Sequence, residues 1–76
     1  MRIKYFKALR WEMLQHDVDV KLLARRLLRS ESYIRARLNA ESPWELDECY
    51  KILDMLRVPH ERFVEMFPPV ELKKGA

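Results

Sequence analysis

Between residues 20 and 39, apolar residues recur at helical spacing among polar ones. The apolar positions of the first run recur every three or four residues: Val20, Leu23, Ala24 and Leu27. Ile34 and Leu38 repeat this spacing after a break at Arg29-Ser30, and Ser30 is a suitable N-cap for a helix that begins at Glu31. The pattern predicts two short helices joined by a tight turn. This is the layout of a helix-turn-helix, whose second helix enters the major groove of DNA.

Similar patterns predict a helix on either side of this pair. Before it, a helix over about residues 5–15 has an apolar face with Trp11 at its edge: Phe6, Leu9, Met13 and Leu14. Asp19 is a plausible N-cap for the helix that follows. After the pair, a fourth helix begins between Pro43 and Leu46, where Ser42-Pro43-Trp44-Glu45 looks like a capping box. Its expected buried stripe has Ile52 on the flank: Leu46, Cys49, Tyr50, Leu53 and Leu56.

A fifth helix is predicted after Val58-Pro59, and Pro68-Pro69 would end it. Its apolar residues are Phe63, Val64, Met66 and Phe67. A short helix at the edge of so small a domain is not expected to bury all four. Phe63, Met66 and Phe67 are therefore predicted to form the interface of a homodimer.

Composition favours one all-α domain over residues 1–76, with a short tail from about residue 70. Of the 76 residues, 49% are apolar and 36% are charged, and only one is Gly, which disfavours tight hairpins and phosphate-binding loops. Cys49 is the only cysteine, so no intrachain disulfide can form. The chain has no apolar run near 18 residues and no signal-peptide pattern, so we expect a cytoplasmic protein with no contact to a membrane.

Charge is distributed unevenly along the chain, although the net charge is only +3. Residues 1–37 include ten basic and four acidic residues, whereas residues 41–71 include three basic and eight acidic residues. One half of the molecule is therefore basic and the other acidic, which indicates a defined binding side for a polyanion.

Three stretches occur in order along the chain: DVKLLARRLLRSESYIRARLNA, SPWELDECYKILDMLRV and PHERFVEMF. The first looks like the second helix, the turn and the recognition helix of the small phage-type repressors of the Cro/lambda-repressor (XRE) helix-turn-helix family, and the other two look like the fourth and fifth helices of that family. The resemblance covers about Leu9 to Phe67. The resemblance implies a five-helix domain that binds double-stranded DNA, often as a homodimer, and regulates transcription.

Residues 31–39 would then be the helix that reads DNA. With Ile34 and Leu38 inward, the outward positions are expected to contact base edges: Glu31, Ser32, Arg35 and Ala36. Contacts to the phosphate backbone are expected from another set: Lys21, Arg25, Arg29, Arg37 and Asn39. Lys7 and Arg10 would add to the positive field.

Four positions depart from the family pattern. Leu28, Ala40 and Arg57 stand where the family usually has Gly, and Val20 stands where it often has a Gln that touches a phosphate. We expect the turn to be rebuilt so that Leu28 packs inward. These departures and the acidic half also favour a second hypothesis, a protein-interaction module, antirepressor-like, that keeps the fold but binds no operator.

Enzymatic chemistry is not expected. His16 and His60 are far apart in the sequence, and with one Cys they cannot fill a structural zinc site without carboxylates. Asp17 and Asp19 flank His16 without a nucleophile, and no phosphate-binding loop or nucleophile elbow is present. No metal, cofactor or small-molecule substrate is predicted.

Overall fold

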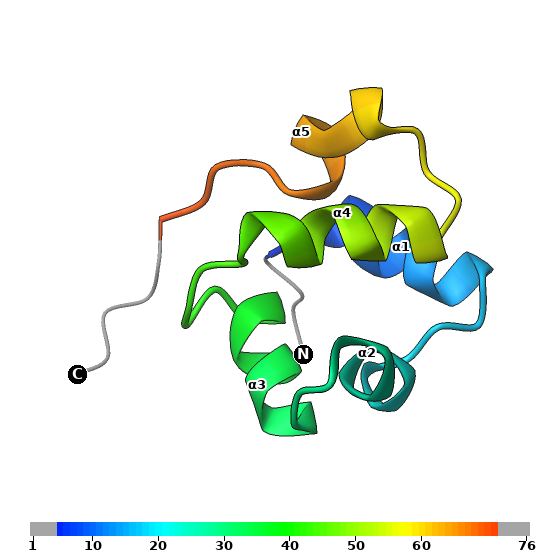
Figure 1. The fold of residues 1–76 in the computed structure, drawn as a ribbon. Helices are drawn as coiled ribbons and strands as arrows, with labels where there is room; N and C mark the ends of the chain where they lie inside the picture. Colours follow the sequence, from blue (N-terminus) through cyan, green and yellow to red (C-terminus); the bar gives the residue numbers. More distant parts are fainter. Residues whose placement is uncertain (1–4, 72–76) are drawn as a thin grey trace.

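Helices make up all the regular secondary structure of residues 5–71, the part of the chain that the computed structural model describes (Figure 1). In chain order the elements are α1 (Lys7–Gln15), α2 (Val20–Leu27), α3 (Glu31–Leu38), α4 (Leu46–Met55), the 3-10 helix η1 (His60–Arg62) and α5 (Phe63–Met66). The prediction of an all-α chain is therefore confirmed for these residues. The predicted tail begins at Val70, and most of it lies outside the described residues.

Side-chain caps begin two of the helices as the sequence predicts. The Leu22 amide donates to Asp19 Oδ1 at 2.9 Å, and the Tyr33 amide donates to Ser30 Oγ at 3.1 Å. The predicted capping box before α4 is wrong. The α4 helix begins at Leu46, the last position of the predicted range, and Glu45 occupies its N-cap position without a side-chain hydrogen bond.

One apolar core receives side chains from all five α-helices. Its largest fully buried members are Leu9, Leu23, Ile34, Ile52, Leu53, Leu56 and Met66. Three predicted core positions are instead at the surface: Leu14 on α1 is 68% exposed and Leu46 on α4 is 62% exposed, and Tyr50 also faces solvent. Ile52, expected on the flank, is fully buried in their place, so the buried face of α4 is rotated from the predicted stripe.

The α5 helix has only four residues and lies against α1. Val64 is 67% exposed and Phe63 is partly buried, but Met66 and Phe67 belong to the core. The Phe67 ring packs against Trp44 and Phe6, with ring centroids 5.6 Å and 6.3 Å apart respectively. Met66 and Phe67 are therefore not available to a partner in this conformation, which corrects their expected exposure. A homodimer, in itself, stays a prediction.

The first four α-helices end without glycine, although each is followed by a residue in the left-handed region. These residues are Asp17, Leu28, Ala40 and Arg57, with φ between 55° and 58°. After each of them an amide bonds back to a carbonyl five residues earlier; after α2, the Arg29 amide donates to the Ala24 carbonyl at 2.9 Å. Leu28 is 89% exposed, so the expected rebuilt turn with Leu28 packed inward is wrong.

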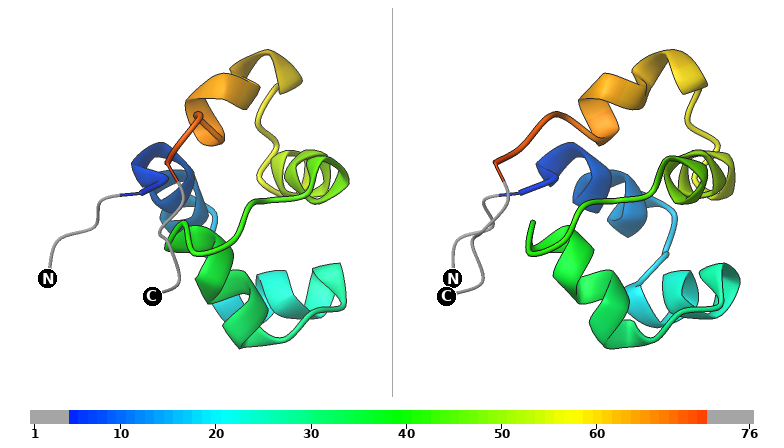
Figure 2. Two further views of the ribbon diagram at one scale, coloured as in Figure 1. Left: turned by 90° about the vertical axis from the view of Figure 1, so that its left-hand side faces the viewer. Right: turned by 60° about the vertical axis from the view of Figure 1, so that its left-hand side comes forward.

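The helices α2 and α3, the predicted helix-turn-helix, form one end of the molecule. The α2 and α3 helices lie at one end, α5 lies at the other, and α1 and α4 lie between them (Figure 2). Because α2 and α3 share their inner faces with the core, their outer faces form the surface of that end. The predicted DNA-binding residues therefore come from one end of the molecule.

Candidate nucleic-acid interface

The α3 helix is anchored by two buried side chains and presents its other faces outward. Ile34 and Leu38 are in the core, as predicted. Ser32 and Arg35 are exposed, whereas Glu31 and Ala36 are partly exposed. The four predicted base-reading residues thus remain accessible along α3, at the spacing that a helix needs to reach successive base pairs.

Glu31 and Arg35 form an ion pair on this outer surface. The Arg35 Nη2 atom lies 2.9 Å from Glu31 Oε1, one helical turn away. Both side chains are about half exposed, so the pair contributes little stability. The pair does restrict the orientation of the Arg35 guanidinium.

The first turn of α3 is tied to α4 through a buried carboxylate. Glu48 is only 3% exposed, and its Oε2 atom accepts from the Tyr33 hydroxyl at 2.9 Å and from Arg29 Nε at 3.2 Å. Burial and the hydrogen bond to Glu48 raise the pKa of Tyr33, so the hydroxyl remains a donor. Glu48 Oε1 has no hydrogen-bond partner among the described residues. This carboxylate therefore links the α2–α3 turn to the core helix α4.

Two guanidinium groups cover the Tyr33 ring. The Arg37 guanidinium carbon lies 3.3 Å from the ring centroid, and that of Arg29 lies 4.7 Å from it. Arg29 Nη2 also lies 3.8 Å from Glu45 Oε1. Arg29 and Arg37, predicted to contact phosphates, are thus held by contacts within the protein.

Arg10 holds the other end of α3. Its Nη2 donates to the Leu38 carbonyl at 2.7 Å and to Asn39 Oδ1 at 3.1 Å, and its Nε donates to the Tyr5 carbonyl at 2.9 Å. Partial burial lowers the pKa of Arg10 from its ordinary value. The side-chain oxygen of Asn39, also a predicted phosphate contact, therefore already has a donor.

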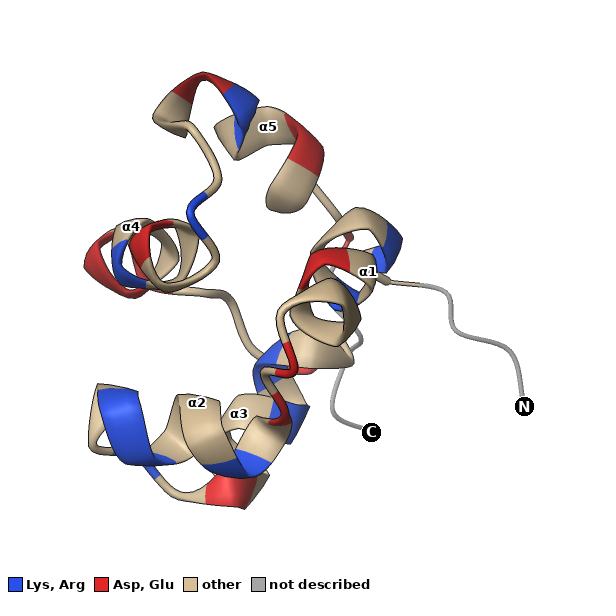
Figure 3. Ribbon diagram, turned by 90° about the vertical axis from the view of Figure 1, so that its right-hand side faces the viewer, with Lys and Arg blue, Asp and Glu red and all other residues tan. Residues whose placement is uncertain are grey.

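The cations of α2 differ from those near α3. Lys21, Arg25 and Arg26 are exposed and have no ion-pair partner within residues 5–71. Figure 3 shows basic residues concentrated on α2 and α3, whereas acidic residues occupy much of α4. Unpaired cations attract anions more strongly than paired ones do, so α2 carries the strongest positive field of the described α2–α3 pair.

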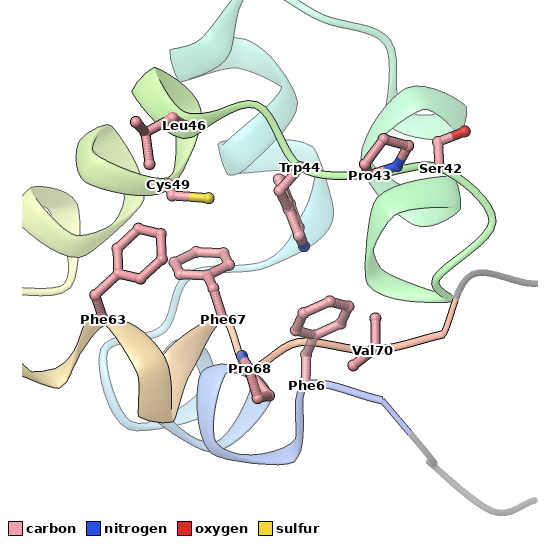
Figure 4. Close-up of a pocket in the computed structure, with 10 residues that line it drawn as sticks. All are labelled: Phe6, Ser42, Pro43, Trp44, Leu46, Cys49, Phe63, Phe67, Pro68 and Val70. Carbon is pink, nitrogen blue, oxygen red and sulfur yellow. The ribbon is translucent and has the colours of Figure 1, made fainter.

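A hollow of about 340 Å³ lies between α5 and the segment that leads from α3 into α4 (Figure 4). Its lining contains no charged side chain: Phe6, Ser42, Pro43, Trp44, Leu46, Cys49, Phe63, Phe67, Pro68 and Val70. Burial, together with the Glu48 charge, raises the pKa of Cys49 to about 12, so this thiol stays protonated near neutral pH. Cys49 is 3% exposed and belongs to the core, as the predicted stripe of α4 requires.

No group of three or more potential metal ligands is found among the described residues. The same residues contain no helix long and apolar enough to cross a membrane. No family model, curated protein or solved structure matches this chain. The function is therefore inferred from the arrangement of the side chains of this chain alone.

The sequence did not identify two of the residues that organise this surface. Glu48 was counted only as one of the acids of the second half, and Tyr33 was not assigned. The contact between them joins residues 15 apart, and no local pattern signals it. The chemical signal is weak: Tyr33 stands four residues after Arg29 and four before Arg37, so it could stack with either of them.

Proposed function

We propose that the protein is a sequence-specific DNA-binding regulator in which α2 and α3 form a lambda-repressor-like helix-turn-helix. The observation that carries this proposal is the position of α3. Its inner side is fixed by Ile34 and Leu38, and its outer side carries accessible polar residues. Next to it on α2 lie cations that have no ion pair among residues 5–71. The left-handed residue at Leu28 also supports the proposal, because the family it resembles usually has Gly at that place.

In this proposal Arg35 and Ser32 contact base edges from the middle of α3. The guanidinium of Arg35 can take guanine O6 and N7 together, once it exchanges Glu31 for the base or bonds to both. Glu31 is suited to accept from a cytosine amino group, and the short Ala36 permits close approach to a thymine methyl group. These four residues supply the specificity.

Phosphate contacts come mainly from Lys21 and Arg25, whose charges are unpaired within the described chain. Arg29, Arg37 and Asn39 remain predicted phosphate contacts, although each also makes a contact inside the protein. Arg29 bonds to Glu48 and Asn39 accepts from Arg10, which orients the two ends of α3, whereas Arg37 stacks on Tyr33 within α3 itself. The resemblance of the chain to phage-type repressors makes a repressor or genetic switch the most suitable biological role.

The test is selection of bound sequences from a random duplex library, followed by titration of the selected duplex at several salt concentrations. We expect log affinity to fall linearly with log salt, with a slope that reflects several phosphate contacts. Arg35→Ala should cost about 1–3 kcal/mol of discrimination at particular base pairs, whereas Arg25→Ala should weaken all sequences equally and reduce the slope by about one. If both variants act equally on all sequences, α3 does not read bases.

A second function is favoured by the hollow between α4 and α5. Its lining is apolar, and three exposed acids, Glu45, Asp47 and Glu71, stand next to lining residues in the sequence. A protein partner with a basic amphipathic segment would suit such a site. If no duplex is retained at low salt, this interaction module replaces the DNA-binding proposal.

A further inference from the structure

A second hollow, of about 400 Å³, lies between α2 and α4. Five residues line it: Arg26, Leu27, Lys51, Asp54 and Met55. The first two belong to the last turn of α2 and the others to α4, and Figures 1 and 3 both show α2 below α4. The volume is within the range of small-molecule sites, roughly 300–1,000 Å³. The hollow therefore has room for a ligand that contacts both helices.

Two of the lining residues are cations without an ion pair. Arg26 and Lys51 are exposed, and neither is paired with a carboxylate within residues 5–71. They belong to different helices, so it is the fold that brings the two charges to one hollow. Arginine offers a planar fork of donors and lysine a mobile ammonium group. A phosphate group, which carries up to two negative charges and three strong acceptor oxygens, can bond to both cations.

Arg26 points to a different side of α2 from the proposed DNA-phosphate contacts. Lys21 and Arg25 are one turn apart and share a face of the helix. Arg26 directly follows Arg25, so it is turned from it by about 100° around the helix axis. Its place in the hollow with Lys51 shows that it is turned toward α4. The charge of Arg26 is therefore left for a separate ligand.

The remaining lining residues define the organic part of that ligand. Leu27 is buried and Met55 is partly buried, so together they supply an apolar wall. The methionine sulfur favours contact with an aromatic ring. Asp54 Oδ1 lies 2.8 Å from His60 Nε2, and the second oxygen of this carboxylate can accept from a ligand hydroxyl. Two cations, an apolar wall and an acceptor suit a phosphate monoester that carries an aromatic ring and hydroxyl groups.

We propose that the hollow between α2 and α4 binds a small organic phosphate of the nucleoside monophosphate class. Its phosphate bonds to Arg26 and Lys51, its ring lies against Leu27 and Met55, and a sugar hydroxyl donates to Asp54. The site uses none of the residues assigned to DNA in the proposed function. The bound ligand connects α2, the first helix of the proposed helix-turn-helix, to the core helix α4.

The acids around Lys51 select a compact ligand. Asp47 and Asp54 are exposed and stand within one helical turn of Lys51, one on each side of it in the sequence. A long polyanion, such as duplex DNA or an acidic protein segment, would bring further negative charges against these carboxylates and be repelled. A single phosphate group held between Arg26 and Lys51 avoids that repulsion.

Titration with adenosine monophosphate, followed by NMR spectra of the backbone amides at constant ionic strength, tests the proposal. Adenosine and inorganic phosphate are the matched probes, since the first lacks the phosphate and the second lacks the ring and the sugar. We expect a dissociation constant of roughly 0.1–1 mM for adenosine monophosphate, and at least about fivefold weaker binding of the other two probes. The amide signals that shift should belong to the end of α2 and the second half of α4.

Two variants test the phosphate contacts. Arg26→Ala and Lys51→Ala should each weaken the binding of adenosine monophosphate at least about fivefold, because each removes a charge-assisted hydrogen bond. Arg25→Ala is the matched control, since it removes the same charge from the neighbouring position of α2, and it should bind this probe like the wild type. All three positions are exposed on helices, where alanine preserves the helix, and circular dichroism confirms folding.

Three results would overturn the proposal. They are adenosine that binds as tightly as its monophosphate, equal weakening by Arg25→Ala and Arg26→Ala, and a wild type whose signals do not shift at about 10 mM probe. A duplex titration adds a fourth: if Arg26→Ala reduces the salt slope of duplex binding by about one, Arg26 contacts DNA and the inference is wrong. A chain that binds adenosine monophosphate but retains no duplex refutes the proposed function alone.

Discussion

The helices α3 and α4 are similar in length but are held in the fold in different ways. The α4 helix buries Cys49, Ile52 and Leu53 along one face, together with the carboxylate of Glu48. The α3 helix buries only Ile34 and Leu38 and depends on polar bonds at both ends. Apolar burial therefore places α4, whereas the orientation of α3 also requires hydrogen bonds and ion pairs with a defined geometry.

The difference between the two helices bears on function. A helix fixed by two apolar side chains can still rotate about its own axis, and such a rotation would move the proposed base-reading side chains away from a DNA groove. The bonds of Glu48 to the start of α3 and of Arg10 to its end oppose that rotation. Three predictions test this comparison.

The largest expected effect is on the link between the two helices. Glu48→Ala should lower the free energy of unfolding by roughly 1–3 kcal/mol, because Tyr33 loses its acceptor and Arg29 loses its closest ion pair. Urea unfolding measures the change. Glu45→Ala is the control; since its contact to Arg29 is longer and more exposed, its effect should stay within about 0.5 kcal/mol. Equal losses in both variants would show that the buried link adds no stability.

A smaller effect on stability should come from the titration of the Cys49 thiol on α4. Burial raises the pKa of Cys49 to about 12, above the value of about 8.5 for an unfolded chain. The folded state therefore disfavours the thiolate, and its stabilising contribution is complete below pH 8.5 and is lost as the pH rises toward 12. We expect thermal melts to show a loss of about 1–2 kcal/mol between pH 8 and pH 10.

Cys49→Ala removes this titration and should give a flatter pH profile over the same range. The comparison stays below pH 10 because the raised pKa of Tyr33 acts in the same direction at higher pH. A profile that is identical for the variant and the wild type would show that the thiol is not the titrating group.

The smallest effect concerns the two non-glycine residues with positive φ that follow α2 and α4, Leu28 and Arg57. Leu28→Gly and Arg57→Gly should each raise stability by about 0.5–1 kcal/mol, because glycine adopts a positive φ without steric cost. Ala36→Gly, within α3, is the matched control and should lower stability by about 1 kcal/mol. A lower melting midpoint for Leu28→Gly than for the wild type would contradict the prediction.

Local patterns in the sequence predicted the features that depend on neighbouring residues. Asp19 and Ser30 were recognised as caps because a cap acts within one helical turn. The inward positions of Ile34 and Leu38 followed from helical spacing in the same way. The all-α class and the four outward positions of α3 were therefore accessible without a structure.

Features that depend on distant residues were not predicted. Leu14 and Leu46 fit an apolar stripe, but what covers a helix face is decided by elements far along the chain. Leu28 was expected to pack inward because it is apolar, whereas the hydrogen bonds that end α2 require a left-handed residue there. The partner of Tyr33 could not be predicted, since any of eight acids in the second half could have reached it.

The aromatic cluster of Phe6, Trp44 and Phe67 has a consequence for the order of folding. It joins residues from before α1, before α4 and the end of α5, so it closes loops that span most of the described chain. The α2–α3 contact closes a very short one. Because loop closure costs entropy that grows with length, we expect the pair α2–α3 to form early and the cluster to form late. During synthesis, the chain could not complete its core until Phe67 had left the ribosome.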